Sequence, residues 1–256
     1  MRVIVTRPAA QAEEWVAQLR SHRIDAVALP LIDIVAVADR SPIDVAWAGL
    51  GDQALVVFVS PNAAEQFFAA RSPTSTWPPH TLAGSPGPGT TRTLRSLGVP
   101  AGQIVEPAAD SAQFDSQALW LALEGRRAWR GAPVLIVRGD GGREWLAEAL
   151  RGVGANVTTL SAYRRAAPVL GEREQALMQR AFAAPAAWLW FFSSSEAIDH
   201  LEALAGPRPP PAWATLVALA THPRIAERAR ALGSAHVRLA RPALADVIAC
   251  LQSTAP

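Results

Sequence analysis

Residues 134–165 read VLIVRGDGGREWLAEALRGVGANVTTLSAYRR and predict one complete strand, turn, helix and strand. Residues 134–137 form an apolar run typical of a buried strand, and the glycines within 138–143 allow a tight turn after it. A second strand is predicted at 157–160. Such units build parallel sheets that bind ligands at the carboxyl ends of their strands. We therefore expect ligand-binding and catalytic residues at 138–143 and 163–165.

The residues between these two strands predict an amphipathic helix. Trp145, Leu146, Ala149 and Leu150 share one apolar face, and charged residues lie largely on the other. The pattern predicts that this face packs on the sheet and that the helix stops at Gly152.

The rest of the chain alternates in the same way. Apolar runs of strand length precede amphipathic helices, and these runs lie at 3–5, 24–29, 54–59, 81–83, 104–105, 188–192, 216–220 and 237–239. Parts of the pattern repeat, since residues 3–7 parallel 135–138, 58–63 parallel 191–196, and 90–98 parallel 223–233. We predict an α/β fold of two similar parallel-sheet domains, with a small-molecule site in a cleft between them.

The amino-acid composition narrows the classes of function. Half of the 256 residues are apolar, so a substantial core can form. The 24 basic residues, against 22 acidic ones, are all arginines and form no basic block, which argues against nucleic-acid binding. The lack of lysine also excludes a P-loop at the glycine-rich turn 84–90.

Cysteine content and hydropathy bear on where the protein works. Cys250 is the single cysteine, which excludes an internal disulfide, and no Cys or His cluster has metal-ligand spacing. The chain begins directly as a strand without an apolar export segment, and its apolar run at 188–192 is too short to cross a bilayer. We expect a cytoplasmic monomer without a metal or a membrane partner.

The glycine turn after the first quoted strand is the first candidate site. Gly139, Gly141 and Gly142 do not form the Gly-x-Gly-x-x-Gly dinucleotide pattern, and no acidic residue ends the next strand to hold a ribose. Arg138 and Arg143 flank the turn, and guanidinium groups with free amides at a helix start suit a carboxylate or a phosphate. The alternative is a strand-to-helix turn without a ligand.

Hydroxyl and imidazole groups follow other predicted strands. Tyr163, the only tyrosine, precedes two arginines that favour loss of its proton, so general acid catalysis and ordinary packing are both open. Residues 193–195 are serines without the nucleophile elbow of a serine hydrolase, which favours helix capping and ligand hydrogen bonding. Ser60 or Asn62 is expected to cap a helix, and His222, in the turn before a helix, is expected near a ligand.

Seven segments, in this order and spacing, resemble the uroporphyrinogen-III synthase family over nearly the whole chain. They are Val5-Thr6-Arg7-Pro8 with Gln11, Phe58-Val59-Ser60-Pro61-Asn62-Ala63, Gly87-Pro88-Gly89-Thr90, Val137-Arg138-Gly139-Asp140-Gly141-Gly142-Arg143, Tyr163-Arg164-Arg165, the serine loop at Ser193, and His222-Pro223-Arg224-Ile225-Ala226. The resemblance implies a cofactor-free enzyme of tetrapyrrole biosynthesis.

The reaction implied by this resemblance closes the linear tetrapyrrole hydroxymethylbilane into uroporphyrinogen III and inverts its last pyrrole ring. The terminal hydroxyl leaves as water to give an azafulvene, which ring D attacks through its substituted carbon. The resulting spiro intermediate fragments and recloses the other way round. The protein must then supply a proton, fold the substrate chain and exclude unrearranged closure.

The resemblance also implies roles for individual residues. Tyr163 matches the tyrosine that is favoured as the acid in this family. The implied substrate-binding set is Thr6, Arg7, Ser60, Thr90, Arg138, Gly139, Gly142, Arg143, Ser193, Ser194 and His222. Many members have a Gly-x-x-Thr-Ala turn in the second half, where this chain reads His222-Pro223-Arg224-Ile225-Ala226, so Thr221 or His222 is expected to replace the missing hydroxyl.

The resemblance corrects the contiguous halves that the repeat alone suggests. Residues 1–36 with 167–256 are expected to form one α/β domain and 37–166 the other, joined by a two-stranded extended linker that lets them close on substrate. Two other classes remain open. One is a non-catalytic, two-lobed protein that binds an anionic small molecule, and the other is a nucleotide-dependent oxidoreductase, which rests on the glycine turn alone.

Overall fold

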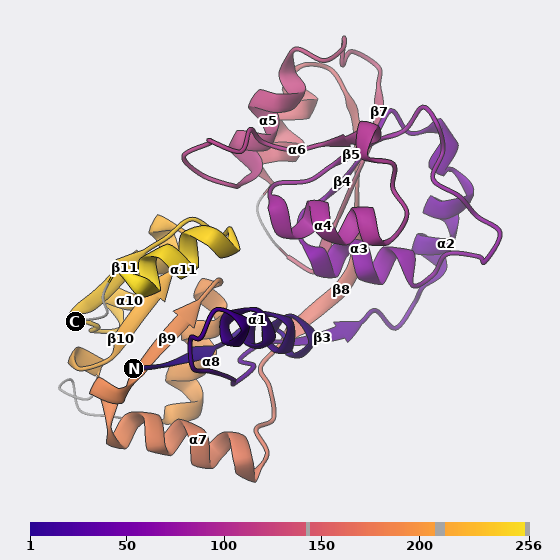
Figure 1. Ribbon diagram of the computed structural model, residues 1–256. Coiled ribbons are helices and arrows are strands. Elements are labelled where there is room, and N and C mark those ends of the chain that lie inside the picture. The colour runs from indigo at the N-terminus through magenta and orange to yellow at the C-terminus, as the bar shows by residue number, and fades with distance from the viewer. Residues whose placement is uncertain (142–143, 208–212, 254–256) are drawn as a thin grey trace. The chain divides into compact units, whose positions relative to one another are not determined.

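The computed structural model describes residues 1–141, 144–207 and 213–253, and internal contacts divide the chain into two units. Unit 1 comprises Met1–Asp33 and Ala166–Pro256, and unit 2 comprises Ile34–Arg165. Each unit holds a sheet with helices packed on it (Figure 1). The predicted fold class, two α/β domains with parallel sheets, is confirmed.

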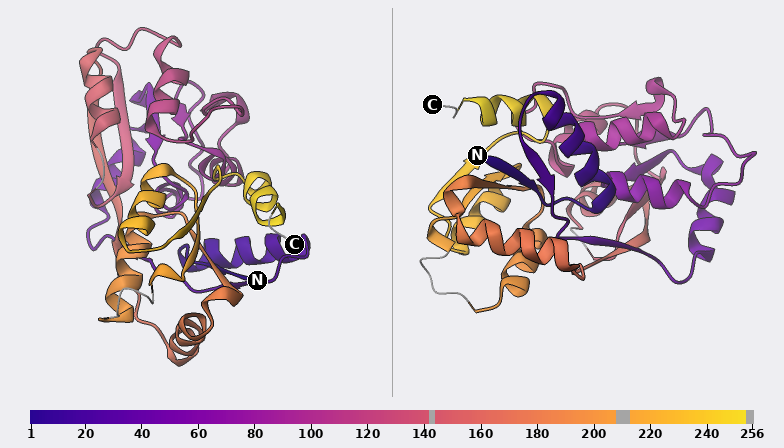
Figure 2. Two further views of the ribbon diagram at one scale, coloured as in Figure 1. Left: turned by 90° about the vertical axis from the view of Figure 1, so that its left-hand side faces the viewer. Right: turned by 60° about the horizontal axis from the view of Figure 1, so that its bottom comes forward.

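The sheet of unit 1 joins the two ends of the chain. Its strands are β1 (Arg2–Val5), β2 (Ala26–Ala28), β9 (Trp188–Phe192), β10 (Val217–Ala220) and β11 (His236–Leu239), in the order β11-β10-β9-β1-β2. Every neighbouring pair runs parallel. Figure 2 shows the N-terminal strand beside the orange and yellow C-terminal part of the chain, because β1 inserts between β2 and β9.

Helices cover the unit 1 sheet because its strands are apolar on both faces. They are α1 (Ala9–Ser21), α7 (Glu172–Ala183), α8 (Ser195–Ala205), α10 (Pro223–Ala231) and α11 (Leu244–Gln252), with a short 3-10 turn, η3 (Pro185–Ala187). Trp15 of α1 and Val247 of α11 pack in one cluster with Val3 and Phe191. Trp190, the neighbour of Phe191 in β9, points to the opposite face, where its ring contacts Phe182 of α7.

Over the described residues, the sheet of unit 2 has six strands. They are β3 (Asp33–Ala36), β4 (Leu55–Phe58), β5 (Leu82–Gly84), β6 (Ile104–Val105), β7 (Pro133–Gly139) and β8 (Asn156–Ala166), in the order β3-β8-β7-β4-β5-β6. The pairs from β8 through β7, β4 and β5 to β6 are all parallel. The chain passes from one unit to the other within β3 and at the end of β8.

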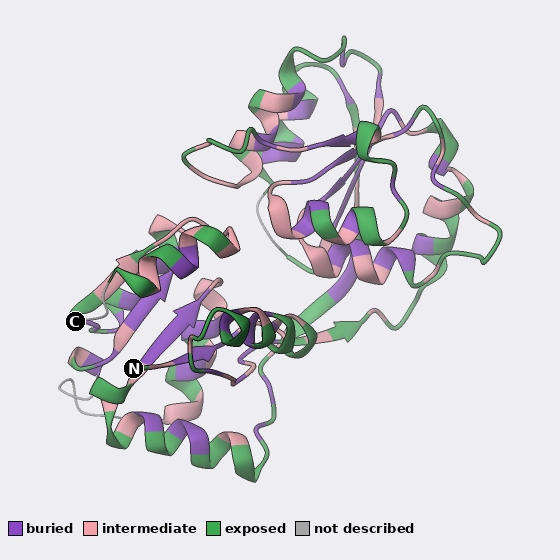
Figure 3. Ribbon diagram, viewed as in Figure 1, coloured by how far each residue is buried: buried purple, intermediate pink, exposed green. Residues whose placement is uncertain are grey.

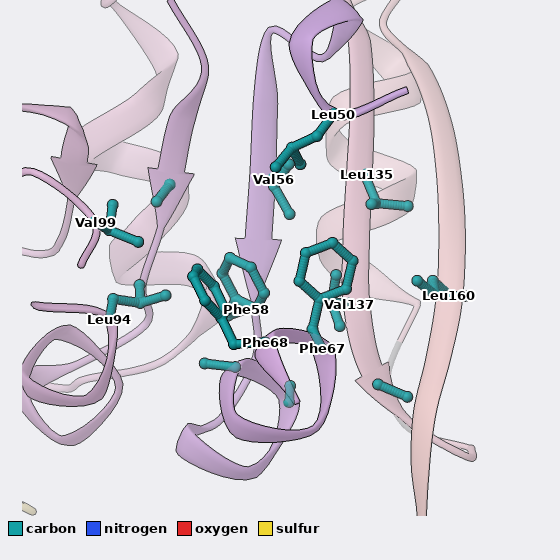
Figure 4. Packing of buried hydrophobic residues seen from close by; sticks show 14 of the residues in the cluster. Leu50, Val56, Phe58, Phe67, Phe68, Leu94, Val99, Leu135, Val137 and Leu160 are labelled. Carbon is teal, nitrogen blue, oxygen red and sulfur yellow. The ribbon is translucent and has the colours of Figure 1, made fainter. Parts of the chain in front are cut away.

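Two apolar layers enclose the unit 2 sheet. The helices are α2 (Ser41–Ala48), α3 (Pro61–Phe68), α4 (Pro88–Ser96), α5 (Ser116–Glu124) and α6 (Trp145–Gly152), with 3-10 turns η1 (Leu50–Asp52) and η2 (Ala101–Gln103). On one face Phe67 and Phe68 of α3 pack on Phe58, as Figure 4 shows, and α5 and α6 cover the other face. Figure 3 shows the result, in which the central strands are buried and each helix buries only one side.

Two details differ from the predicted elements. Trp145, expected on the buried face of its helix, is 37% exposed, and Ala147 is buried instead. Because Trp145 is the first residue of α6, the buried stripe of Leu146, Ala147 and Leu150 leaves it at the margin. The strand predicted at 157–160 also continues to Ala166, so Tyr163 lies within β8 and not beyond its end.

Candidate functional site

The carboxyl ends of β4, β5 and β7 lie along one edge of the unit 2 sheet because these strands are parallel neighbours. Ser60 follows β4 and is the N-cap of α3, where its Oγ accepts the N–H of Ala63 at 3.1 Å. Gly87 follows β5 and is the N-cap of α4, which carries Thr90, buried, in its first turn. The same edge therefore brings together Ser60, the α4 turn and the glycine turn after β7.

Tyr163 reaches this edge through a β-bulge. Arg138 of β7 pairs with Ser161 of β8, but the next residue, Gly139, pairs with Tyr163, so β8 carries one extra residue there. Strict alternation would place Ala162 and Tyr163 on opposite faces, whereas both belong to the cluster that α3 covers. The bulge thus turns the tyrosine ring toward α3.

The phenol of Tyr163 is held by two groups from other strand ends. Its Oη lies 3.0 Å from Oγ of Ser60, and either oxygen can be the donor. A Cβ added at Gly139 would lie 2.8 Å from Cζ and 2.9 Å from Cε2 of the ring, so only glycine fits beneath it. The ring is 3% exposed, which matches the packing alternative, yet its hydroxyl is bonded to a residue at the strand-end edge.

A hydrogen-bond network that the sequence pattern did not reveal fixes the α4 turn. Oγ1 of Thr91 lies 2.6 Å from Oε2 of Glu106 and 2.9 Å from Oγ of Ser85, which in turn contacts the carbonyl oxygen of Gly87 at 2.9 Å. Nη2 of Arg95 contacts the other oxygen of Glu106 at 3.3 Å. Ser85 and Glu106, polar residues directly after β5 and β6, could have indicated the network, but their partners in it lie up to fifteen residues away in the sequence.

Arg138 faces away from Tyr163. Its neighbours Leu135 and Val137 pack toward α3, whereas Ile136 packs toward α6, so the alternation of β7 puts Arg138 on the α6 side. There its Nη1 forms a 2.5 Å ion pair with Glu144, and its side chain is 18% exposed. Its Nε is buried and meets no acceptor among the described residues.

The predicted residues Gly142 and Arg143 lie outside the part of the chain that the structure describes. Asp140 and Gly141, which precede them, are exposed, and the N–H of Asp140 donates to the carbonyl oxygen of Tyr163 at 2.7 Å. The described half of the glycine turn is thus hydrogen-bonded to β8.

Unit 1 has a comparable edge, formed by the carboxyl ends of the neighbouring strands β1, β9 and β10. Thr6, after β1, is 1% exposed and donates its hydroxyl to the carbonyl oxygen of Phe191 at 2.8 Å, which links β1 to β9. The guanidinium of Arg7 lies 4.7 Å from the ring centre of Trp15, and its Nη1 contacts Gln11 at 3.4 Å. Thr6 therefore connects β1 to β9, and the guanidinium of Arg7 packs on Trp15 of α1.

The other two strands of this edge are followed by helix caps, which were expected for the serine loop but not for His222. Ser194, which follows the half-buried Ser193, accepts the N–H of Glu196 at 3.3 Å at the start of α8. Nδ1 of His222 accepts the N–H of Arg224 at 3.2 Å at the start of α10. His222 takes the position that Gly87 has in α4, and the buried Ile225 takes that of Thr90, so the hydroxyl is replaced by an apolar side chain.

Together these features define a class of protein. Parallel strands followed by hydroxyl caps, backbone turns and helix N-termini are typical of α/β proteins that bind small molecules at the carboxyl ends of their strands. This chain has such an edge in each of its two units.

Comparisons with known proteins identify the family. A family model described as uroporphyrinogen-III synthase HemD matches residues 13–249. A mutant uroporphyrinogen III synthase from Thermus thermophilus is similar in fold, at 17% identity over 99% of this chain and 96% of that chain, with a TM-score of 0.57. Uroporphyrinogen-III synthetase from Helicobacter pylori is 14% identical over 99% of this chain and 98% of that chain, with a TM-score of 0.55.

The chain belongs to the uroporphyrinogen-III synthase family, because the family model covers most of its length. It is accordingly an enzyme of tetrapyrrole biosynthesis, a cyclising lyase, and the resemblance inferred from its motifs is confirmed. The alternative of a non-catalytic binding protein is therefore wrong, and so is that of a nucleotide-dependent oxidoreductase. Within the described residues, no helix is long and apolar enough to span a membrane.

Proposed function

We propose that this chain closes hydroxymethylbilane into uroporphyrinogen III, with inversion of ring D and loss of water. The observation that carries the proposal is the pair of binding edges. Of the helices that begin there, α1, α3, α4 and α10 have no Asp or Glu in their first turns, whereas α8 has Glu196. Each pyrrole of the substrate bears an acetate and a propionate, and such helix starts attract carboxylates.

Tyr163 acts as the general acid in this proposal. As the terminal carbon–oxygen bond breaks, its electron pair leaves with the oxygen, which takes the phenol proton and departs as water. The pyrrole nitrogen supplies electrons to the carbon left behind, giving the azafulvene cation. Ring D attacks, the spiro intermediate fragments, and reclosure releases a ring-carbon proton that returns to the phenolate. The net change is loss of one water.

The remaining groups hold the substrate. Arg7, Arg138 and Arg143 would pair with its carboxylates, assisted by the backbone amides of Gly139 and Gly142. Binding by Arg138 requires exchange of its ion pair with Glu144 for a substrate carboxylate.

Uncharged groups of both units complete the set. Thr90 in unit 2, and Thr6, Ser193, Ser194 and His222 in unit 1, would accept from or donate to the substrate. Thr6 can do so only as an acceptor, because its proton is already donated to Phe191. We expect the enzyme to act in the cytoplasm as a monomer, without a cofactor or nucleic acid.

The test is to give the purified protein hydroxymethylbilane, oxidise the products and separate the porphyrin isomers. The proposal predicts isomer III, formed faster than the spontaneous closure to isomer I. Tyr163→Phe should lower turnover by about 10² to 10⁴-fold without unfolding the protein. Isomer I alone, at the spontaneous rate, would refute the function, while an undiminished Tyr163→Phe rate would refute only the role of Tyr163.

A further inference from the structure

The contact between Ser60 and Tyr163 joins residues 103 positions apart and allows the protons at the phenol to be counted. Oγ of Ser60 accepts the N–H of Ala63 at 3.1 Å and lies 3.0 Å from Oη of Tyr163. A serine hydroxyl has one proton to donate and room for two acceptor contacts. Ser60 can therefore keep its helix-capping bond and still donate to the tyrosine.

The direction of this hydrogen bond decides whether the phenol can act as an acid. If Tyr163 donates to Ser60, its only proton is engaged within the protein. If Ser60 donates to Tyr163, the phenol proton is free to leave for the substrate. Once that proton has gone, the phenolate can only accept, so the donor must be Ser60. A donor to an anionic oxygen forms a stronger hydrogen bond than a donor to a neutral one.

We propose that Ser60 is a positioning residue that donates to Tyr163, frees the phenol proton for transfer and stabilises the phenolate left behind. This inference rests on the proposed role of Tyr163 as the acid, and it replaces the expectation that Ser60 binds substrate.

The surroundings of the pair suit this role. Ser60 is the N-cap of α3, so the phenol oxygen lies at the positive end of an eight-residue helix, which favours the anion. The ring cannot shift easily, because it is 3% exposed and lies against Gly139 on one side. Arg164 and Arg165, which the sequence pattern suggested as stabilising charges, are exposed.

The experiment separates positioning from substrate binding and from helix capping. Ser60→Ala removes both the donor and the cap, and Ser60→Thr keeps both. Asp115→Ala is the matched control, because Asp115 caps α5 in the same unit by accepting the N–H groups of Gln117 and Ala118 at 2.9 and 3.0 Å. For each variant kcat and KM are measured for isomer III formation, together with the urea midpoint. Each serine change is also combined with Tyr163→Phe.

The inference predicts that Ser60→Ala lowers kcat by about 10- to 100-fold with KM unchanged, the range expected for a hydrogen bond to a charged group. Ser60→Thr should restore most of the lost rate. Asp115→Ala should lower the urea midpoint as Ser60→Ala does, yet keep kcat. In the Tyr163→Phe background, Ser60→Ala should not lower kcat further, because the two side chains act as one unit.

A raised KM with unchanged kcat would overturn the inference, because Ser60 would then be a substrate ligand. If Ser60→Ala lowers kcat by the same factor in the wild-type protein and in the Tyr163→Phe variant, the inference is also overturned, since Ser60 would act independently of the phenol. An unchanged kcat in Tyr163→Phe alone would refute the acid itself, and a wild-type protein that forms no isomer III would refute the proposed function, so each failure is distinguishable.

Discussion

Replacing Gly139 by alanine should displace Tyr163 and thereby test the geometry of the site. The added Cβ would lie 2.8 Å from Cζ, 2.9 Å from Cε2 and 3.2 Å from Oη of the ring. Real Cβ atoms do not approach so closely, and the buried ring has to move. Gly139 is not among the glycines with a positive φ, so its backbone accepts alanine and the effect comes from this contact.

The magnitude follows from three contributions. Overpacking costs about 1 to 3 kcal/mol. Loss of the hydrogen bond to Ser60 destabilises the folded protein by about 1 kcal/mol more. The lower conformational entropy of the unfolded alanine chain offsets about 0.4 to 1 kcal/mol of this loss. The free energy of unfolding should therefore fall by about 1 to 4 kcal/mol, which lowers the urea midpoint by about 1 M at unchanged m. The turnover number should also fall, because the acid is displaced.

Urea unfolding followed by tryptophan fluorescence, with kcat measured on the same samples, provides the assay. Gly152→Ala at the end of α6 is the control, because no atom lies within 4 Å of its added Cβ, and it should keep or slightly raise stability. In a Tyr163→Leu background the cost of Gly139→Ala should largely vanish. A Gly139→Ala protein as stable and as active as the wild type would refute the reasoning.

Three further expectations concern other described residues. Thr91→Val removes the hydroxyl that contacts the fully buried Ser85, so it should lower the free energy of unfolding by about 1 to 3 kcal/mol in urea titration, and no loss would contradict the network. Thr6→Val removes the donor to Phe191 and should cost about 1 kcal/mol in the same titration, whereas an unchanged midpoint would show that this bond does not stabilise the sheet. Burial raises the pKa of the Cys250 thiol, so less thiolate is present at about pH 8 and iodoacetamide should alkylate the native protein more slowly than the urea-unfolded one; equal rates would contradict this.

The elements themselves could be predicted because they depend on local periodicity. The apolar run at Trp188–Phe192 is β9 with the predicted bounds, and Ser60 and Ser194 cap the helices that follow their strands. A cap is made within three residues of the helix start, so the short motif contains the whole interaction.

The contacts within the site could not be predicted, because they join residues from different strands and helices that no local sequence pattern relates. The bulge at Tyr163 exists only relative to β7, although the adjacent apolar residues Ala162 and Tyr163 break the alternation of the strand and could have signalled it. Arg138 was expected beside the turn, and its ion pair with Glu144 depends on where α6 begins. The bond between Ser60 and Tyr163 required both strands to be in place.

The central claim is that this chain directs ring closure of hydroxymethylbilane, and isomer composition tests it most directly. At a fixed substrate concentration, the spontaneous reaction gives isomer I and competes with the enzyme. The claim predicts that the fraction of isomer III rises from zero toward completeness as enzyme is added. A product that remains isomer I at every enzyme concentration would contradict it.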